Sequence, residues 1–136
     1  MNRESAIVIG GIGDGRDKPK MRPHENLDMW KKAVELSLLI YNLTQKFPNS
    51  ELYGLTSQLR RAAVSVPANI AEGAARQTKT EFKQFLFIAR GSLSELATEL
   101  HIAAKLGYIT IETAQAPEKL CDDIGAMLTA MIKKLS

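Results

Sequence analysis

The sequence of 136 residues is poor in the side chains that usually carry metal or redox chemistry, with one cysteine and two histidines. A single cysteine, Cys121, excludes a disulfide within the chain and a cysteine-based metal cluster. A di-metal site in a helical bundle needs inward glutamates and two Glu-x-x-His pairs. Only His101 lies in a predicted helix, and no glutamate precedes it by three residues. We therefore expect no metal and no other cofactor.

The sequence also lacks a recognisable set of catalytic residues for hydrolysis. His101 has no identifiable nucleophilic or orienting partner, and Cys121 is followed directly by Asp122 and Asp123. Nearby carboxylates disfavour the thiolate, which is the nucleophilic form of cysteine. We predict that the chain is not an enzyme, that Cys121 fills apolar space, and that His101 is a surface or helix-packing residue.

Long apolar runs are also absent. No stretch reaches the roughly 18 uninterrupted apolar residues that a membrane helix needs, and the apolar segment 6–9 is too short for a signal peptide. The single cysteine fits a reducing compartment. These features together predict a cytoplasmic protein without a membrane partner.

Residues 1–24 differ in composition from the remainder, with four glycines between positions 10 and 15. Gly11 and Gly13 match the first two glycines of a dinucleotide-binding fingerprint, but Arg16 replaces the third and no βαβ pattern follows. We interpret 1–24 as a flexible arm and 25–136 as a single domain.

The clearest helical pattern covers residues 55–73, LTSQLRRAAVSVPANIAEG. One face is apolar, with Leu52, Leu55, Leu59, Ala63, Val66 and Ile70 at helical spacing. A second face carries mostly small side chains, which allow a neighbour to approach closely: Gly54, Ser57, Arg61, Ser65, Ala68 and Glu72. Pro67 lies inside the pattern without an amide donor, so a kink or a local break is expected.

Three other segments have helical periodicity, and no strand is predicted after the arm. Pro117 fits poorly deep inside a helix, so we expect either a kink there or a separate helical turn at 111–116. Gly107 is suited to end the third helix in a left-handed conformation. The expected helices are about 27–46, about 51–75, a third from a capping box of Thr78 and Glu81 to about 106, and a fourth capped by Thr110.

The apolar faces of these helices predict how they pack. The stripe of the first helix is wider than one core usually needs, so either packing is generous or part of it faces another subunit. The third helix keeps a three-four spacing typical of a left-handed bundle: Phe82, Phe85, Ala89, Leu93, Leu96, Leu100 and Ala103. In the fourth helix, the predicted buried residues are Leu120, Ile124, Met127, Met131 and Leu135. We predict an all-α, up-down antiparallel four-helix bundle that associates with itself through its first two helices.

The central motif resembles a known family. LTSQLRRAAVSVPANIAEG, with LDMWKKA upstream and EFKQFLFIARGSLSELATEL and LGYI downstream, is similar to the 23S ribosomal RNA intervening-sequence proteins, also called four helix bundle proteins. The resemblance covers roughly residue 26 to the C-terminus. It implies an up-down four-helix bundle and a homopentameric ring. A more distant relative, the accessory variability determinant of diversity-generating retroelements, is a basic pentamer that binds nucleic acid and a reverse transcriptase.

Basic residues are concentrated in one part of the chain, although the net charge is only +3. At spacings of three, four and seven, Arg76, Lys79, Lys83 and Arg90 fall on one face and form the candidate nucleic-acid-binding strip. Aromatic residues for base stacking are expected to be absent from this strip, so recognition of phosphate rather than of base sequence is expected. Lys133 and Lys134, at the far end of the fourth helix, are expected to contribute little.

The other polar residues of the motif suggest a structural or interface role. Glu72 and Arg76 have the spacing of a favourable ion pair, and Asn69 could satisfy backbone groups freed by Pro67. Arg61 is suited to an ion pair between subunits. The residues assigned to this role are Arg60, Arg61, Pro67, Asn69 and Glu72.

Two functions remain open at this point. The first is a non-enzymatic oligomer that contacts RNA or DNA through repeated basic strips, because symmetry multiplies a modest local field. The second is a structural scaffold or an adaptor for a protein partner that ignores nucleic acid. Binding that weakens steeply with salt would distinguish the first from the second.

Overall fold

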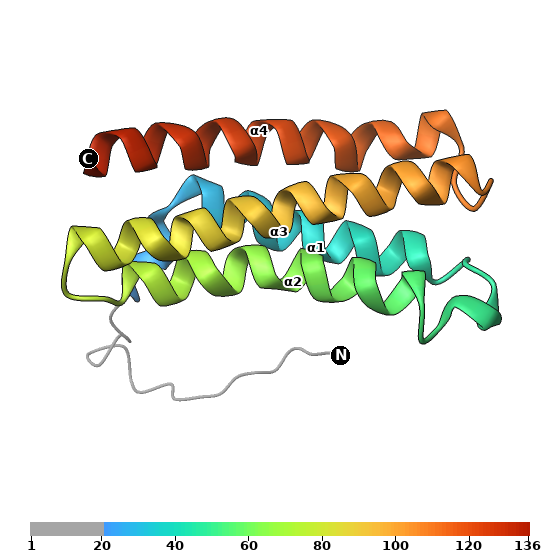
Figure 1. The fold of residues 1–136 in the computed structure, drawn as a ribbon, viewed down its shortest axis with the longest axis horizontal. Helices are drawn as coiled ribbons and strands as arrows, with labels where there is room; N and C mark the ends of the chain where they lie inside the picture. The colour runs from blue at the N-terminus through green and yellow to red at the C-terminus, as the bar shows by residue number, and fades with distance from the viewer. Residues whose placement is uncertain (1–20) are drawn as a thin grey trace, which may run out of the picture.

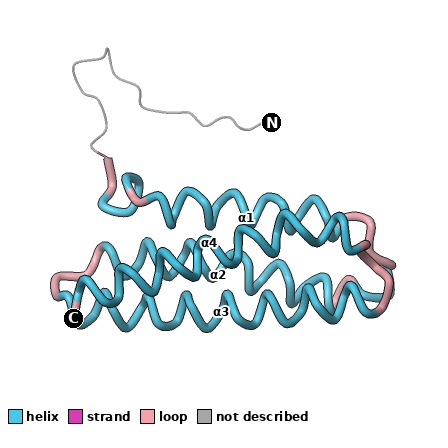
Figure 2. The backbone as a smooth tube through the Cα atoms, turned by 90° about the horizontal axis from the view of Figure 1, so that it is seen from above, coloured by secondary structure: helices cyan, strands magenta, loops and turns pink. Residues whose placement is uncertain are grey.

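The structure is a computed structural model that describes residues 21–136, in which four long helices run side by side in alternating directions (Figure 1, Figure 2). Two short 3-10 helices, η1 and η2, precede α1 and α2, and the described part of the chain contains no strand. The elements are η1 (Pro23–Asn26), α1 (Asp28–Thr44), η2 (Asn49–Glu51), α2 (Leu55–Ala74), α3 (Lys79–Lys105) and α4 (Ile111–Leu135). The predicted all-α, up-down arrangement of four helices is confirmed. Of the predicted arm, residues 1–20 lie outside the described residues.

Local sequence signals explain where α3 and α4 begin and end. The Thr78 hydroxyl accepts a hydrogen bond from the Glu81 amide at 3.1 Å, as predicted for this cap. Thr110 caps α4 in the same way, with the Thr113 amide 3.0 Å from its hydroxyl. Gly107 has a φ of +81°, which is the left-handed conformation that glycine adopts readily. The amide of Tyr108 then bonds to the carbonyl of Ala103, which closes α3 with a Schellman motif.

Neither proline interrupts its helix, so the predicted local break at Pro67 and the separate turn at 111–116 are both wrong. Pro67 leaves the Ala63 carbonyl without its usual amide donor. The buried hydroxyl of Ser37, from α1, donates to this carbonyl at 3.0 Å and compensates for the missing bond. Asn69 does not fill this role, because its amide donates to the carbonyl and hydroxyl of Ser65. In α4, Pro117 is buried within a continuous helix.

The core lies where the four apolar faces meet. Leu96, in the predicted seam of α3, is fully buried, and so are Leu36 in α1 and Leu59 in α2. Of the predicted face of α4, Ile124 is buried, and the other members are partly buried and packed against the core: Leu120, Met127, Met131 and Leu135. The residues that α4 buries are Ala114, Pro117, Cys121, Ile124, Leu128 and Ile132. Pro117 lies within this inward face, between Ala114 and Cys121.

Candidate nucleic-acid interface and the apolar face of the bundle

The basic strip follows the edge of α3 that faces α4. The ammonium of Lys83 lies 3.3 Å from the Ser136 hydroxyl, which follows α4. About two turns further along α3, the guanidinium of Arg90 lies 3.3 Å from the Thr129 hydroxyl of α4. The structure therefore brings Lys83 and Arg90 together on one edge of the bundle.

Arg76 and Lys79 lie at the start of this strip, around the turn between α2 and α3. Arg76 forms the predicted ion pair with Glu72 at 2.8 Å, and its guanidinium lies 4.8 Å from the centre of the Phe85 ring. Because Glu72 offsets the charge of Arg76, this arginine offers less to a ligand than the exposed Lys79, which is the first residue of α3.

Lys133 belongs to the same surface, contrary to the expectation that it lies far away. It is placed four residues after Thr129 and three before Ser136, the two α4-side residues that the strip contacts. Residues three and four apart share one side of a helix. In an antiparallel bundle the end of α4 adjoins the beginning of α3 (Figure 1). Lys134 is turned toward α1, where it lines a groove with Leu27.

An aromatic ring also lies within the strip, which the sequence reasoning missed. Phe87 follows Lys83 by four residues and precedes Arg90 by three, so all three share one side of α3. Its side chain is 48% exposed, and the Arg90 guanidinium lies 5.0 Å from its ring centre. The spacing of four and three residues from Lys83 to Phe87 to Arg90 could have identified this ring from the sequence. It was missed because the neighbouring phenylalanines, Phe82 and Phe85, were assigned to the buried seam.

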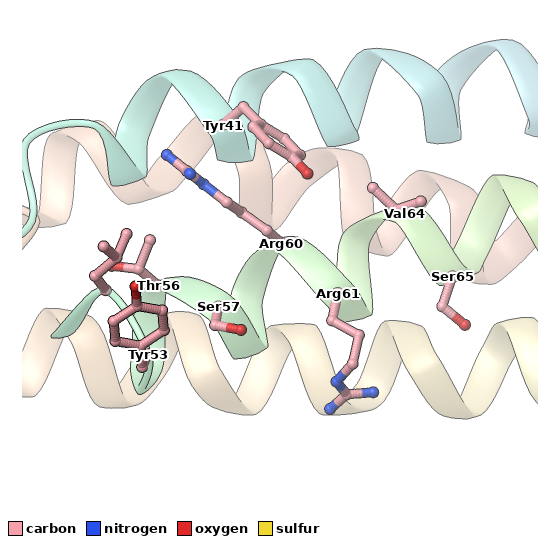
Figure 3. Close-up of a pocket in the computed structure, with 9 residues that line it drawn as sticks. Tyr41, Tyr53, Thr56, Ser57, Arg60, Arg61, Val64 and Ser65 are labelled. Carbon is pink, nitrogen blue, oxygen red and sulfur yellow. The ribbon is translucent and has the colours of Figure 1, made fainter.

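Arg60 and Arg61 both make contacts within the chain. Arg60 donates through Nε to the Thr44 hydroxyl at 2.8 Å, and its guanidinium lies 4.6 Å from the Tyr41 ring centre. In Figure 3 its side chain extends toward Tyr41, whereas Arg61 extends away from it. Arg61 pairs with Glu95 of α3, so within the chain it forms an ion pair between two helices.

The small-residue face of α2 contacts α3 at Ser65, whereas Ser57 and Ala68 of the same face are exposed. The hydroxyls of Ser65 and Ser92 are 2.8 Å apart. Near the end of α2, a side chain at Gly73 would collide with Phe85, because a Cβ there would lie 2.7 Å from the Phe85 Cβ. Ser65 and Gly73 thus serve close packing within the chain, and the outward face of α1 and α2 is formed by other residues.

That outward face is apolar and is centred on a groove of about 610 Å³ along α2 (Figure 3). Tyr53 is 94% exposed, and Leu38, which belongs to the wide stripe of the first helix, is 67% exposed. Part of the wide stripe therefore faces outward rather than into the core. We call this surface the α1/α2 face and define it by its exposed apolar residues, Leu38, Tyr41, Leu52, Tyr53 and Val64.

A buried acid between α2 and α3 was not predicted. Glu99 is 6% exposed, and its Oε1 has no hydrogen-bond partner among the described residues. Burial raises the pKa of Glu99 to about 7, a hydrogen bond and repulsion from Glu95 add to the rise, and Arg61 opposes it. Near neutral pH this carboxyl is therefore partly protonated inside the bundle.

Cys121, whose reactivity was considered above, is buried in α4. Burial, with the nearby Asp122 and Glu118, raises the pKa of the Cys121 thiol to about 12, so the thiol stays protonated. No group of three or more possible metal ligands gathers within 21–136. Over the same range, no helix is long and apolar enough to cross a membrane.

Comparison with known proteins agrees with this architecture. Residues 25–130 match the model of a family described as 23S rRNA-intervening sequence protein. A solved structure of a protein with unknown function, from the S23 ribosomal protein family of Bacteroides thetaiotaomicron VPI-5482, is similar with a TM-score of 0.72 and 26% identity. The similarity covers 77% of this chain and 98% of that one. No curated protein matches the chain.

Proposed function

The chain belongs to the 23S rRNA-intervening sequence protein family, and we propose that it is a non-enzymatic, oligomeric protein that binds RNA or DNA through repeated basic surfaces. The observation that carries this proposal is the convergence of four cations along the α3/α4 edge. We call this set the basic edge: Lys79, Lys83, Arg90 and Lys133.

The chemistry of the basic edge favours phosphate as its ligand. Lys83 and Arg90 contact hydroxyl groups rather than carboxylates, so their charges are not neutralised by these partners. When lysine and arginine side chains neutralise phosphates, counterions are released from the nucleic acid. This release supplies most of the free energy of non-specific binding. Four such cations on one chain form a modest site, and repetition in an oligomer would make it substantial.

Self-association through the α1/α2 face is the second part of the proposal. A monomer would leave Leu38 and Tyr53 in water, whereas covering apolar surface contributes about 25 cal/mol per Å². In the bundle, α1 packs against α2 and α4 but not α3, so the α1/α2 side and the α3/α4 edge lie on opposite sides. Association at one side leaves the other free for a ligand. The family resemblance implies five copies, and we propose a cytoplasmic homopentamer.

Electrophoretic mobility shift with generic RNA and DNA at increasing salt tests the binding function. We expect a complex at low salt that weakens steeply as salt rises, because phosphate contacts release counterions. The alternative function, a scaffold or protein adaptor, is favoured by the size of the exposed α1/α2 face. It predicts a stable oligomer with no shift of either nucleic acid at any salt concentration, and that result would overturn the binding proposal.

A further inference from the structure

We infer that the basic edge takes single-stranded rather than duplex nucleic acid, and that Phe87 is the side chain on which a base stacks. This inference rests on the proposed function and names the class of nucleic acid for the same surface. Its structural basis is the order of side chains along one side of α3: Lys79, Lys83, Phe87 and Arg90.

Packing within the chain does not explain why Phe87 occupies an exposed position. The seam of α3 is complete without it, because Leu86 and Ala89, on either side of it, are both fully buried. Two residues earlier, Phe85 packs against Gly73 and accounts for the aromatic contact of the α2–α3 turn. An exposed phenylalanine within a row of cations is therefore available to a ligand with a flat, electron-rich ring.

The surroundings of Phe87 suit a ligand that presents both phosphates and free base faces. At 1.5 Å per residue, Lys83 lies about 6 Å before Phe87 along the helix axis and Arg90 about 4.5 Å after it. A base on the ring would therefore have cations on both sides for its flanking phosphates. The Arg90 guanidinium lies over one face of the Phe87 ring, 5.0 Å from its centre, and contacts Thr129 of α4, so a base would stack on the opposite face.

Single strands and duplexes differ in what they can offer to such a surface. In a duplex the faces of the bases are stacked on one another and are inaccessible to Phe87. The edge of a helical bundle also offers no wedge-shaped side chain that would insert between two base pairs and separate them. A single strand has free base faces, and stacking on an aromatic side chain combined with a basic track is the usual mode of binding single strands. The combination therefore favours a single strand with little preference for base sequence.

Fluorescence anisotropy with the full-length protein tests this inference. The probes are labelled oligouridine, oligothymidine and a perfectly paired RNA duplex of equal length. Phe87→Ala should raise the Kd for both single strands by about 5- to 140-fold, the range that stacking of one base supplies. The Kd for the duplex and the dependence of log Kd on log salt should stay the same, because the substitution removes no charge.

Two further variants separate stacking from general apolar contact. Ile88→Ala removes a neighbouring exposed side chain that lies off the strip, and it should leave the Kd for single strands unchanged. Phe87→Trp should retain binding. In a Trp30→Phe background, which removes the natural tryptophan, the introduced indole should lose fluorescence when a single strand binds.

The outcomes distinguish this inference from the function on which it rests. If Phe87→Ala binds single strands as tightly as the wild type while Lys79→Glu/Lys83→Glu does not, the edge binds phosphate alone and the inference is wrong, whereas the proposed function stands. Equal losses in Phe87→Ala and Ile88→Ala, or tighter wild-type binding to the duplex, would also overturn it. A wild-type protein that binds none of the probes would overturn both.

Discussion

Replacing Glu99 with glutamine should stabilise the bundle at alkaline pH and remove part of its pH dependence. Glu99 is buried between α2 and α3, and its Oε1 has no partner in the described structure. Burial raises its pKa from 4.5 to about 7 in the folded state, with the adjacent Glu95 adding to the rise. The folded protein thus binds this proton more tightly than the unfolded chain does, and folding is favoured most where Glu99 is protonated.

The sign and size of the effect follow from linkage between proton binding and folding. The contribution is fully present below the unfolded pKa and is lost as pH rises through the folded pKa, so stability falls between about pH 4.5 and about pH 7. At 1.36 kcal/mol per pH unit, a rise from 4.5 to about 7 sets an upper limit of about 3 kcal/mol. Because the protein relaxes around the ionised carboxylate, we expect about 1–3 kcal/mol.

Urea unfolding at about pH 5 and about pH 8 measures this difference. The wild type should lose about 1–3 kcal/mol between the two conditions, and Glu99→Gln should lose much less, since glutamine keeps the shape without the charge. All other ionisable groups are the same in both proteins, so their contributions cancel in the comparison. Glu118→Gln, on an exposed position of α4, is the matched control. The same loss of stability in Glu99→Gln and wild type would refute the reasoning.

Three other predictions test the packing and the assembly. Leu96→Ala should lower the free energy of unfolding by about 2–5 kcal/mol, because Leu96 is fully buried; a change near zero in a urea melt would contradict its place in the core. Ser37→Ala should cost about 1–3 kcal/mol in the same assay, since the Ala63 carbonyl beside Pro67 loses the hydroxyl that compensates it; Ser57→Ala, on an exposed position, should be near neutral. Light scattering should give the mass of five chains for the wild type and a smaller mass for Leu38→Asp/Tyr53→Asp, which puts charge on the α1/α2 face; a monomeric wild type would contradict this part of the account.

Apolar periodicity was sufficient to predict the four helices and most of their inward faces. The seam of α3 was found because its spacing continues without interruption through Leu96 and Leu100, both of which are buried. The inward part of α4 before Leu120 was missed because Pro117 was expected to mark a kink or the start of the main helix. A buried proline can lie inside a continuous helix when the carbonyl that loses its amide donor finds another partner. Pro117 leaves the Thr113 carbonyl without an amide donor. Because Thr113 is exposed, water can donate to this carbonyl instead.

Features that join two helices were less accessible from the sequence. The hydroxyl of Ser37 compensates for Pro67, which lies thirty positions away, and no local pattern connects the two. Lys133 joins the basic edge only because antiparallel packing places the end of α4 beside the start of α3. Arg61 was identified as a partner in an ion pair, but its acid, Glu95, is on the neighbouring helix of the same chain. Such pairings depend on the rotation of each helix about its axis, which periodicity fixes only approximately.

The salt dependence of binding by a charge-reversed protein tests the central claim, that the basic edge holds phosphate. Lys79→Glu/Lys83→Glu should weaken binding to RNA and DNA of all sequences alike. It should also lower the slope of log Kobs against log salt by about 1.4 per chain for single strands, or about 0.7 for each lost contact. The matched control, Lys46→Glu/Lys105→Glu, makes the same charge change at the opposite end of the bundle, where α1 and α3 end, and should keep the wild-type slope. An unchanged slope in the first variant, or an equal decrease in both, would contradict the account.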